Sequence, residues 1–246
     1  MTWPDGGQAP PEPVHAPAAE PSADERLAAS LRGFGPIGVL AMLPIALIGN
    51  IAIAPMLYVP VGALLALLWV RLSNTPWRDI GYVRPRSWFG TAALGVVLGV
   101  GFKLTMKAIV MPLLGADPIN PTYHFLMGNR PLLPLAIYSM LMAGFGEETV
   151  FRGFAFERLG TLLGNRAWSK ALMVVGTSAW FGAAHLSDQG MSGATQAAIV
   201  GLVLGTMYAF TRRLPLLMII HAAFDLTALA IIYFGLESRV AHWVFQ

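Results

Sequence analysis

Cysteine is absent from the 246 residues, so the chain can form no disulfide, no thiolate nucleophile and no cysteine-ligated metal site. Charge is scarce as well: Asp, Glu, Lys and Arg make up 12% of the residues, about half the fraction of a typical soluble domain. Hydrophobic residues make up 56%, and the mean hydropathy is +0.61. The net charge of +3 is small, and we expect no nucleic-acid partner. Together these numbers favour one integral membrane domain.

The first thirty residues have neither the basic start nor the apolar stretch of a signal peptide. They are rich in Pro and Ala and contain no apolar core. This composition predicts a disordered cytoplasmic tail over residues 1–30. A single transmembrane domain is expected to follow over residues 31–240.

Seven apolar stretches follow the tail, each near the ~20 residues that cross a hydrocarbon core. Backbone groups in lipid must find hydrogen bonds within their own segment, so these stretches are expected to be helices. The predicted fold is therefore all-α, a polytopic transmembrane helical bundle of about seven spans, within a range of about six to eight. The stretches lie at about 34–52, 55–71, 89–114, 131–163, 168–186, 193–211 and 214–236.

Arginine and lysine set the orientation of such a bundle, because they gather on the cytoplasmic side. With the N-terminus in the cytoplasm, only Arg130 and Arg239 fall on the outer side. We therefore expect a multi-pass protein of the inner (plasma) membrane with a cytoplasmic N-terminus. The residues on the inner side are then Arg26, Arg32, Arg71, Arg78, Arg84, Arg86, Arg152, Arg158, Arg166, Lys170, Arg212 and Arg213.

Several ionisable residues lie inside the apolar stretches. Each costs several kcal/mol in a bilayer, so such groups normally face a cavity or one another. Lys103 and Lys107 are a weaker case, expected to face a cavity or to reach the membrane surface. The stronger candidates are Glu147, Glu148 and Arg152 in the fourth stretch, His185 in the fifth, and His221 and Asp225 in the seventh.

Spacing assigns these side chains to helix faces. Glu148 and Arg152 are four residues apart, so they share a face and can pair. Glu147 points about 100° away from its neighbour and is free to face something else. His221 and Asp225 are also four apart and share one face.

Depth decides which of these residues can meet. If the fourth helix continues to Gly164, Glu147 lies ~25 Å from that end, at about 1.5 Å per residue. His185, with Phe181 stacked one turn before it, then lies at a similar depth, ~23 Å into its own helix. His221 lies only about 10 Å in, so a tilt or a loop must close the gap.

A carboxylate and two histidines in one cavity suit a hydrolytic site. Glu147 could take a proton from a water molecule that His185 also holds. His221 and Asp225 could stabilise an oxyanion, with Asp225 protonated or orienting His221. The non-catalytic alternatives for these residues are a structural Glu–Arg pair, a histidine that only packs, and a His–Asp hydrogen bond that joins two helices.

Three short motifs resemble the CAAX prenyl protease and bacteriocin-processing (CPBP, or Abi) family of intramembrane proteases. They are "EETVFR" from Glu147, "FGAAH" ending at His185 and "HAAFD" from His221 to Asp225. The stretch "RDIGYVRPRSW" is similar to a further segment of the family, and the resemblance covers about residues 75–236.

The resemblance implies a polytopic helical fold and a catalytic set of Glu147, Glu148, Arg152, His185, His221 and Asp225. It assigns the water to Glu147 and His185, and the oxyanion to His221 and Asp225. Asp225 stands where prenyl-processing members carry Asn, and an aspartate donates a hydrogen bond only when it is protonated.

We therefore predict an intramembrane endopeptidase acting on membrane-associated peptides or CAAX-like proteins, including lipid-anchored ones. No cofactor is favoured; zinc held by Glu147, His185 and His221 is the alternative. Two other classes stay open: a non-catalytic scaffold or bacteriocin self-immunity protein of the same fold, and a small proton-coupled transporter. The substrate would approach from the membrane or the cytoplasmic side, and the sequence leaves the oligomeric state open.

Overall fold

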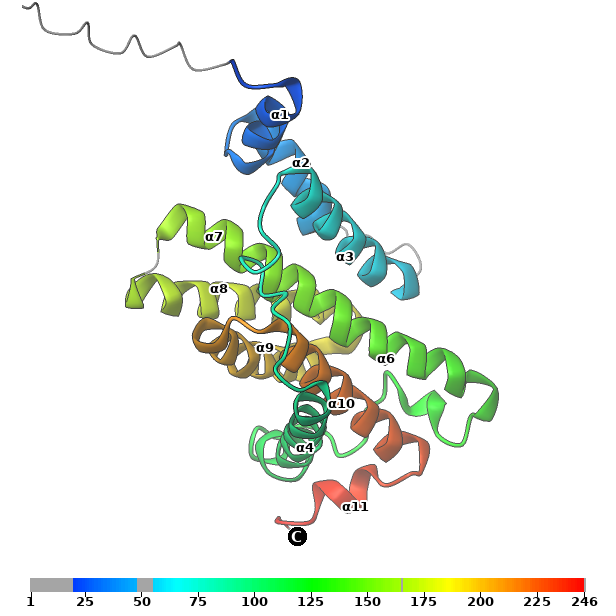
Figure 1. The fold of residues 1–246 in the computed structure, drawn as a ribbon. Coiled ribbons are helices and arrows are strands. Elements are labelled where there is room, and N and C mark those ends of the chain that lie inside the picture. The colour runs from blue at the N-terminus through cyan, green and yellow to red at the C-terminus, as the bar shows by residue number, and fades with distance from the viewer. Residues whose placement is uncertain (1–19, 48–54, 165, 246) are drawn as a thin grey trace, which may run out of the picture.

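The computed structural model describes residues 20–47, 55–164 and 166–245 (Figure 1). Within these ranges every regular element is helical and no strand occurs. The all-α class predicted from the apolar runs is therefore confirmed. Predicted tail residues 1–19 lie outside the described ranges.

The N-terminal part consists of α1 (Ala23–Arg32), α2 (Pro36–Leu47) and α3 (Pro55–Leu72). Helix α1 begins inside the stretch predicted as tail, because Ser22 and Glu25 form a capping box that closes its first turn. The tail boundary predicted at residue 30 therefore lies within a helix. Trp69 of α3 donates a hydrogen bond from its indole N–H to the Leu31 carbonyl oxygen of α1 at 3.2 Å, which joins the two helices.

The predicted third stretch is a helix that changes type along its length. It consists of α4 (Trp88–Thr105), the π-helical segment η2 (Met106–Val110) and the short α5 (Met111–Leu113). The connection that follows contains two 3₁₀ turns, η3 (His124–Leu126) and η4 (Arg130–Leu132).

The predicted fourth stretch is also one continuous helical run. It comprises α6 (Leu133–Glu147), the π-helical segment η5 (Glu148–Phe154) and α7 (Ala155–Leu163). The run ends at Gly164, whose φ of 75° is natural only for glycine. The predicted extension of this helix past Arg152 is confirmed.

Four helices complete the chain. Helices α8 (Ala167–Ala184) and α9 (Leu186–Thr211) form a tight pair, joined at His185. Helix α10 (Leu214–Tyr233) packs against both α4 and α6, and α11 (Glu237–Ala241) closes the end of the bundle (Figure 1).

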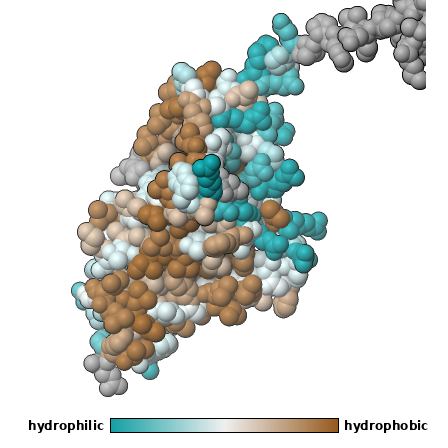
Figure 2. All heavy atoms as spheres, turned by 90° about the vertical axis from the view of Figure 1, so that its left-hand side faces the viewer, coloured by the Kyte–Doolittle hydropathy of each residue, from teal (hydrophilic) through white to brown (hydrophobic). Residues whose placement is uncertain are grey.

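Three of the helical runs are long and apolar enough to span a membrane: residues 88–113, 186–211 and 214–233. The bent pair α1 and α2, which meet at 60°, adds a fourth if it counts as one span. The predicted count of seven is not supported by the described helices. Apolar side chains cover much of the surface seen in Figure 2, while hydrophilic residues gather along one edge.

Glycines set the close approach of α10 to its neighbours. A Cβ on Gly99 of α4 would lie 2.3 Å from the Ile220 carbonyl oxygen, and one on Gly144 of α6 would lie 2.8 Å from the Met218 carbonyl oxygen. Only glycine permits these distances, as is common where membrane helices pack closely. His221, next to Ile220, is thereby brought against the helix that carries Glu147.

Candidate active site

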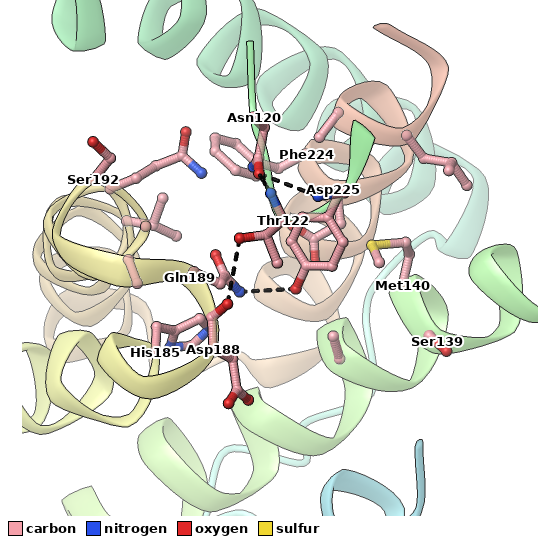
Figure 3. A pocket seen from close by; sticks show the side chains of 18 of the residues that line it. Asn120, Thr122, Ser139, Met140, His185, Asp188, Gln189, Ser192, Phe224 and Asp225 are labelled. Carbon is pink, nitrogen blue, oxygen red and sulfur yellow. Dashed lines mark hydrogen bonds between the residues drawn. The ribbon is translucent and has the colours of Figure 1, made fainter. Parts of the chain in front are cut away.

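A cavity of about 820 Å³ lies between α4, α6, α8, α9 and α10. Its wall includes Glu147, His185, His221 and Asp225, so four of the six predicted site residues face one space. Figure 3 shows part of this wall, with His185 on one side and Asp225 on the other. The remaining two, Glu148 and Arg152, are buried behind it.

Glu148 lies buried at the bottom of the site. Its side chain is fully buried, and Arg152 Nη1 donates to its Oε1 at 2.7 Å, which confirms the predicted pair. His221 Nδ1 donates to the same oxygen at 2.8 Å, although the two residues are 73 positions apart. The carboxylate thus fixes both the arginine and the orientation of the His221 ring.

The other nitrogen of His221 faces two further carboxylates. Its Nε2 lies 3.5 Å from Asp225 Oδ2 and 3.7 Å from Glu147 Oε2. With oxygen atoms opposite both ring nitrogens, the geometry suits an imidazolium ion, the form in which both nitrogens donate. The gap in depth predicted between His221 and Glu147 is therefore closed in the folded chain.

His185 sits where α8 ends and α9 begins. Its Nδ1 donates to the Phe181 carbonyl oxygen at 2.7 Å, which leaves Nε2 as the free nitrogen. The two rings meet edge to face at 4.6 Å, so the predicted stacking is confirmed. The centroid of the Phe181 ring also lies 4.7 Å from the Arg152 guanidinium carbon. Phe181 therefore contacts both His185 and the buried arginine at the bottom of the site.

The segment 116–126 covers the cavity from the end nearest α11. Thr122 Oγ1 donates to the Asp188 carbonyl at 3.3 Å, and Gln189 Nε2 donates to the Tyr123 hydroxyl at 3.1 Å (Figure 3). Burial, aided by the nearby Asp225 carboxylate, raises the pKa of Tyr123, so its hydroxyl stays protonated.

Glu237 holds the same segment from the opposite side. Its carboxylate, only 3% exposed, accepts from the Asn120 backbone N–H at 2.8 Å and from His124 Nδ1 at 3.1 Å. Lys107 Nζ lies 3.8 Å from it. Nothing in the sequence pattern marks Glu237, because its partners are more than a hundred positions away along the chain.

Lysines 103 and 107 both line the cavity, as the weaker prediction expected. Lys103 donates to Gln196 Oε1 at 3.2 Å, while Lys107 donates to the Pro118 carbonyl. Gln196, like Tyr123 and Gln189, carried no signal at the level of sequence, since neutral polar residues are common in helices and loops.

The predicted zinc alternative, with Glu147, His185 and His221 as ligands, stays a prediction. Within residues 20–47, 55–164 and 166–245, no three His, Asp or Glu side chains converge as ligands of one metal ion would. Each of these two histidines donates its Nδ1 proton to an oxygen, His221 to Glu148 and His185 to Phe181, which leaves Nε2 as the nitrogen that a metal ion could take.

Comparison with known proteins supports the resemblance seen in the motifs. Residues 129–227 match the family model described as type II CAAX prenyl endopeptidase Rce1-like, and this region contains all three motifs. Neither a curated protein nor a solved structure matches the chain. Over residues 129–227 the chain is therefore similar to the Rce1-like type II CAAX prenyl endopeptidases.

Proposed function

We propose that the protein is an intramembrane endopeptidase in which Glu147 activates water without a metal. The observation that carries this proposal is that Glu147 and His185 face one cavity while His221 is held beside Glu147 by the buried Glu148–Arg152 pair. Such a division leaves Glu147 free for chemistry while its neighbour is structural.

In the proposed reaction Glu147 removes a proton from a water molecule that His185 Nε2 also contacts, and the oxygen attacks the peptide carbonyl carbon. The negative charge that develops on the carbonyl oxygen is stabilised by the His221 imidazolium. Glu147 then gives the proton to the leaving amine, and the C–N bond breaks. The products at this point are a carboxylic acid and an amine, and the acid passes its proton to the amine to give a carboxylate and an ammonium ion, so atoms and charge balance.

Asp225 takes the orienting role in this scheme. It lies 3.5 Å from His221 Nε2, which places a negative charge beside the imidazolium and favours its charged form. As a carboxylate, Asp225 accepts rather than donates, so His221 is the group that contacts the oxyanion.

The substrate class follows from the cavity and its position. The wall is largely apolar, and its end is formed by segment 116–126 and by α11. In the predicted orientation this end faces the outer side of the membrane, where Arg130 and Arg239 are the only arginines or lysines expected. A peptide anchored in or beside the lipid, including a lipid-modified one, would reach the cavity from this end or from the bilayer.

Glu147→Gln, His185→Ala and His221→Ala in the purified protein test the proposal against a quenched peptide library in lipid vesicles. Removal of a general base is expected to lower cleavage by about 10²–10⁴-fold. Glu20→Gln and His242→Ala, both exposed and outside the cavity, should cleave like the wild type.

Three results would contradict the proposal. A wild type that cleaves nothing points to a scaffold or immunity protein, and proton-dependent flux into vesicles points to a transporter. Loss of cleavage on chelation, restored by zinc, would replace the glutamate mechanism by a metal-dependent one.

A further inference from the structure

The charges around His221 do not balance by themselves. Three carboxylates lie within 4 Å of its ring nitrogens, those of Glu147, Glu148 and Asp225. Against them stand the His221 imidazolium and Arg152. One negative charge is left over, and an unbalanced charge inside a membrane protein is unfavourable.

Lys103 is a buried cation on the facing helix α4. The residue is 7% exposed, and its ammonium contacts the neutral Gln196 and the face of the Phe224 ring, 4.7 Å from the centroid. Among the described residues no carboxylate lies within 4.0 Å of its Nζ. It is therefore a buried positive charge without a direct ion pair.

The position of Lys103 relates it to Asp225. Phe224, the ring under its ammonium, directly precedes Asp225 on α10, and both residues line the cavity with Lys103. Lys107, one turn further on, is already matched by Glu237 at 3.8 Å and is not available for this role.

We infer that Lys103 is a positioning residue of the proposed active site: its charge balances that of Asp225 and so keeps Asp225 beside His221. The inference rests on the proposed function for its catalytic consequence, but the charge balance itself does not. Without Lys103, the excess negative charge would be relieved by moving Asp225 or by protonating one of the carboxylates, and either change disturbs the oxyanion side.

The test is a double-mutant cycle with Lys103→Met, Asp225→Asn and the combined variant, measured in lipid vesicles. Lys103→Met should lower kcat about tenfold with little change in KM, and Lys103→Arg should retain most activity. In the Asp225→Asn background the charge to be balanced is gone, so Lys103→Met should cost less than about twofold. Lys107→Met is the matched control and should show no coupling to Asp225→Asn.

Two kinetic outcomes would overturn the inference. An equal loss of kcat in both backgrounds means that Lys103 acts independently of Asp225. A rise in KM confined to peptides with a free C-terminal carboxylate or an acidic side chain would make Lys103 a substrate ligand instead. Amidated and neutral peptides separate those two sources of the carboxylate.

A second readout does not need activity. In thermal unfolding, Lys103→Met should lower the midpoint, and adding Asp225→Asn should restore most of the loss. If the wild type cleaves nothing, the proposed function fails, yet this cycle still decides the charge pairing. A midpoint that falls equally in both backgrounds contradicts it.

Discussion

At the scale of single residues, the Glu148–Arg152–His221 cluster organises the site. Glu148 is fully buried and Arg152 is 1% exposed, so neither charge can be solvated by water. Adjacent glutamates thus have different tasks: Glu148 is enclosed by two donors, whereas Glu147 faces the cavity. The difference arises because neighbouring positions on a helix point about 100° apart.

Replacing Arg152 by Met should be strongly destabilising. It leaves the Glu148 carboxylate buried beside His221 alone, and breaking a buried ion pair in this way costs about 3–5 kcal/mol. Thermal unfolding in detergent measures the loss. The control is Arg78→Met, whose pair with Asp79 is largely exposed and should contribute about 0–1 kcal/mol. Equal stability of the two variants would contradict a central role for the buried pair.

At the scale of elements, close packing of glycine faces and π-helical segments positions the side chains. Both π-helical segments, η2 and η5, occur where a helix contributes to the cavity or to the cluster behind it. π-Helical segments are rare overall, but those that occur are often found at functional sites. They shift the side chains that follow by part of a turn.

Gly99→Ala should separate α4 from α10. The new Cβ would lie 2.3 Å from the Ile220 carbonyl oxygen, so a backbone must move. We expect a lower thermal midpoint and reduced cleavage, since His221 follows Ile220. Gly101→Ala on the same helix meets nothing within 4 Å and should be neutral or stabilising by up to about 1 kcal/mol. Indistinguishable effects of the two substitutions would show that this contact does not set the helix spacing.

Glu237→Gln should loosen segment 116–126. The carboxylate holds the Asn120 backbone and His124, and the amide would lose the charge that strengthens both hydrogen bonds. Hydrogen exchange of residues 118–126 should rise, while exchange in α8 stays constant. Asp117→Asn, in the same segment but exposed, serves as the control. Unchanged exchange in Glu237→Gln would mean that other contacts hold the segment.

At the scale of the whole molecule, the arginine distribution and the location of the cavity make a joint prediction. The basic residues predicted to be cytoplasmic lie mainly in the connections at one end of the bundle. The cavity is closed by segment 116–126 and α11 at the other end. If the N-terminus is cytoplasmic, this location favours substrates that enter from the lipid or from the outer side. The sequence had instead suggested entry from the membrane or from the cytoplasmic side.

Single cysteines can test this orientation directly, because the chain has none of its own. A membrane-impermeant maleimide on intact cells should label Ser238→Cys on α11, and should label Ala29→Cys on α1 only after permeabilisation. Both positions lie in described helices, and labelling of unsubstituted protein provides the blank. The opposite pattern would reverse the orientation and place the cavity on the cytoplasmic side.

The helical class and the local pairs follow from the amino-acid sequence alone. Long apolar runs without alternation permit only helices in a bilayer. Glu148 and Arg152, Phe181 and His185, and the end at Gly164 depend on spacing within one helix, which the 3.6-residue repeat fixes.

The pairing of charges between helices follows from the folded arrangement and not from spacing along the chain. The Glu148–His221 bond, the hold of Glu237 on segment 116–126, and the position of Lys103 over Phe224 all join distant parts of the chain. Such contacts depend on how closely and at what angle helices cross, which glycine contacts and π-helical turns set. Hydropathy averaged along the chain contains no information on the distance or the angle at which helices cross. For the same reason it did not predict the number of spans correctly.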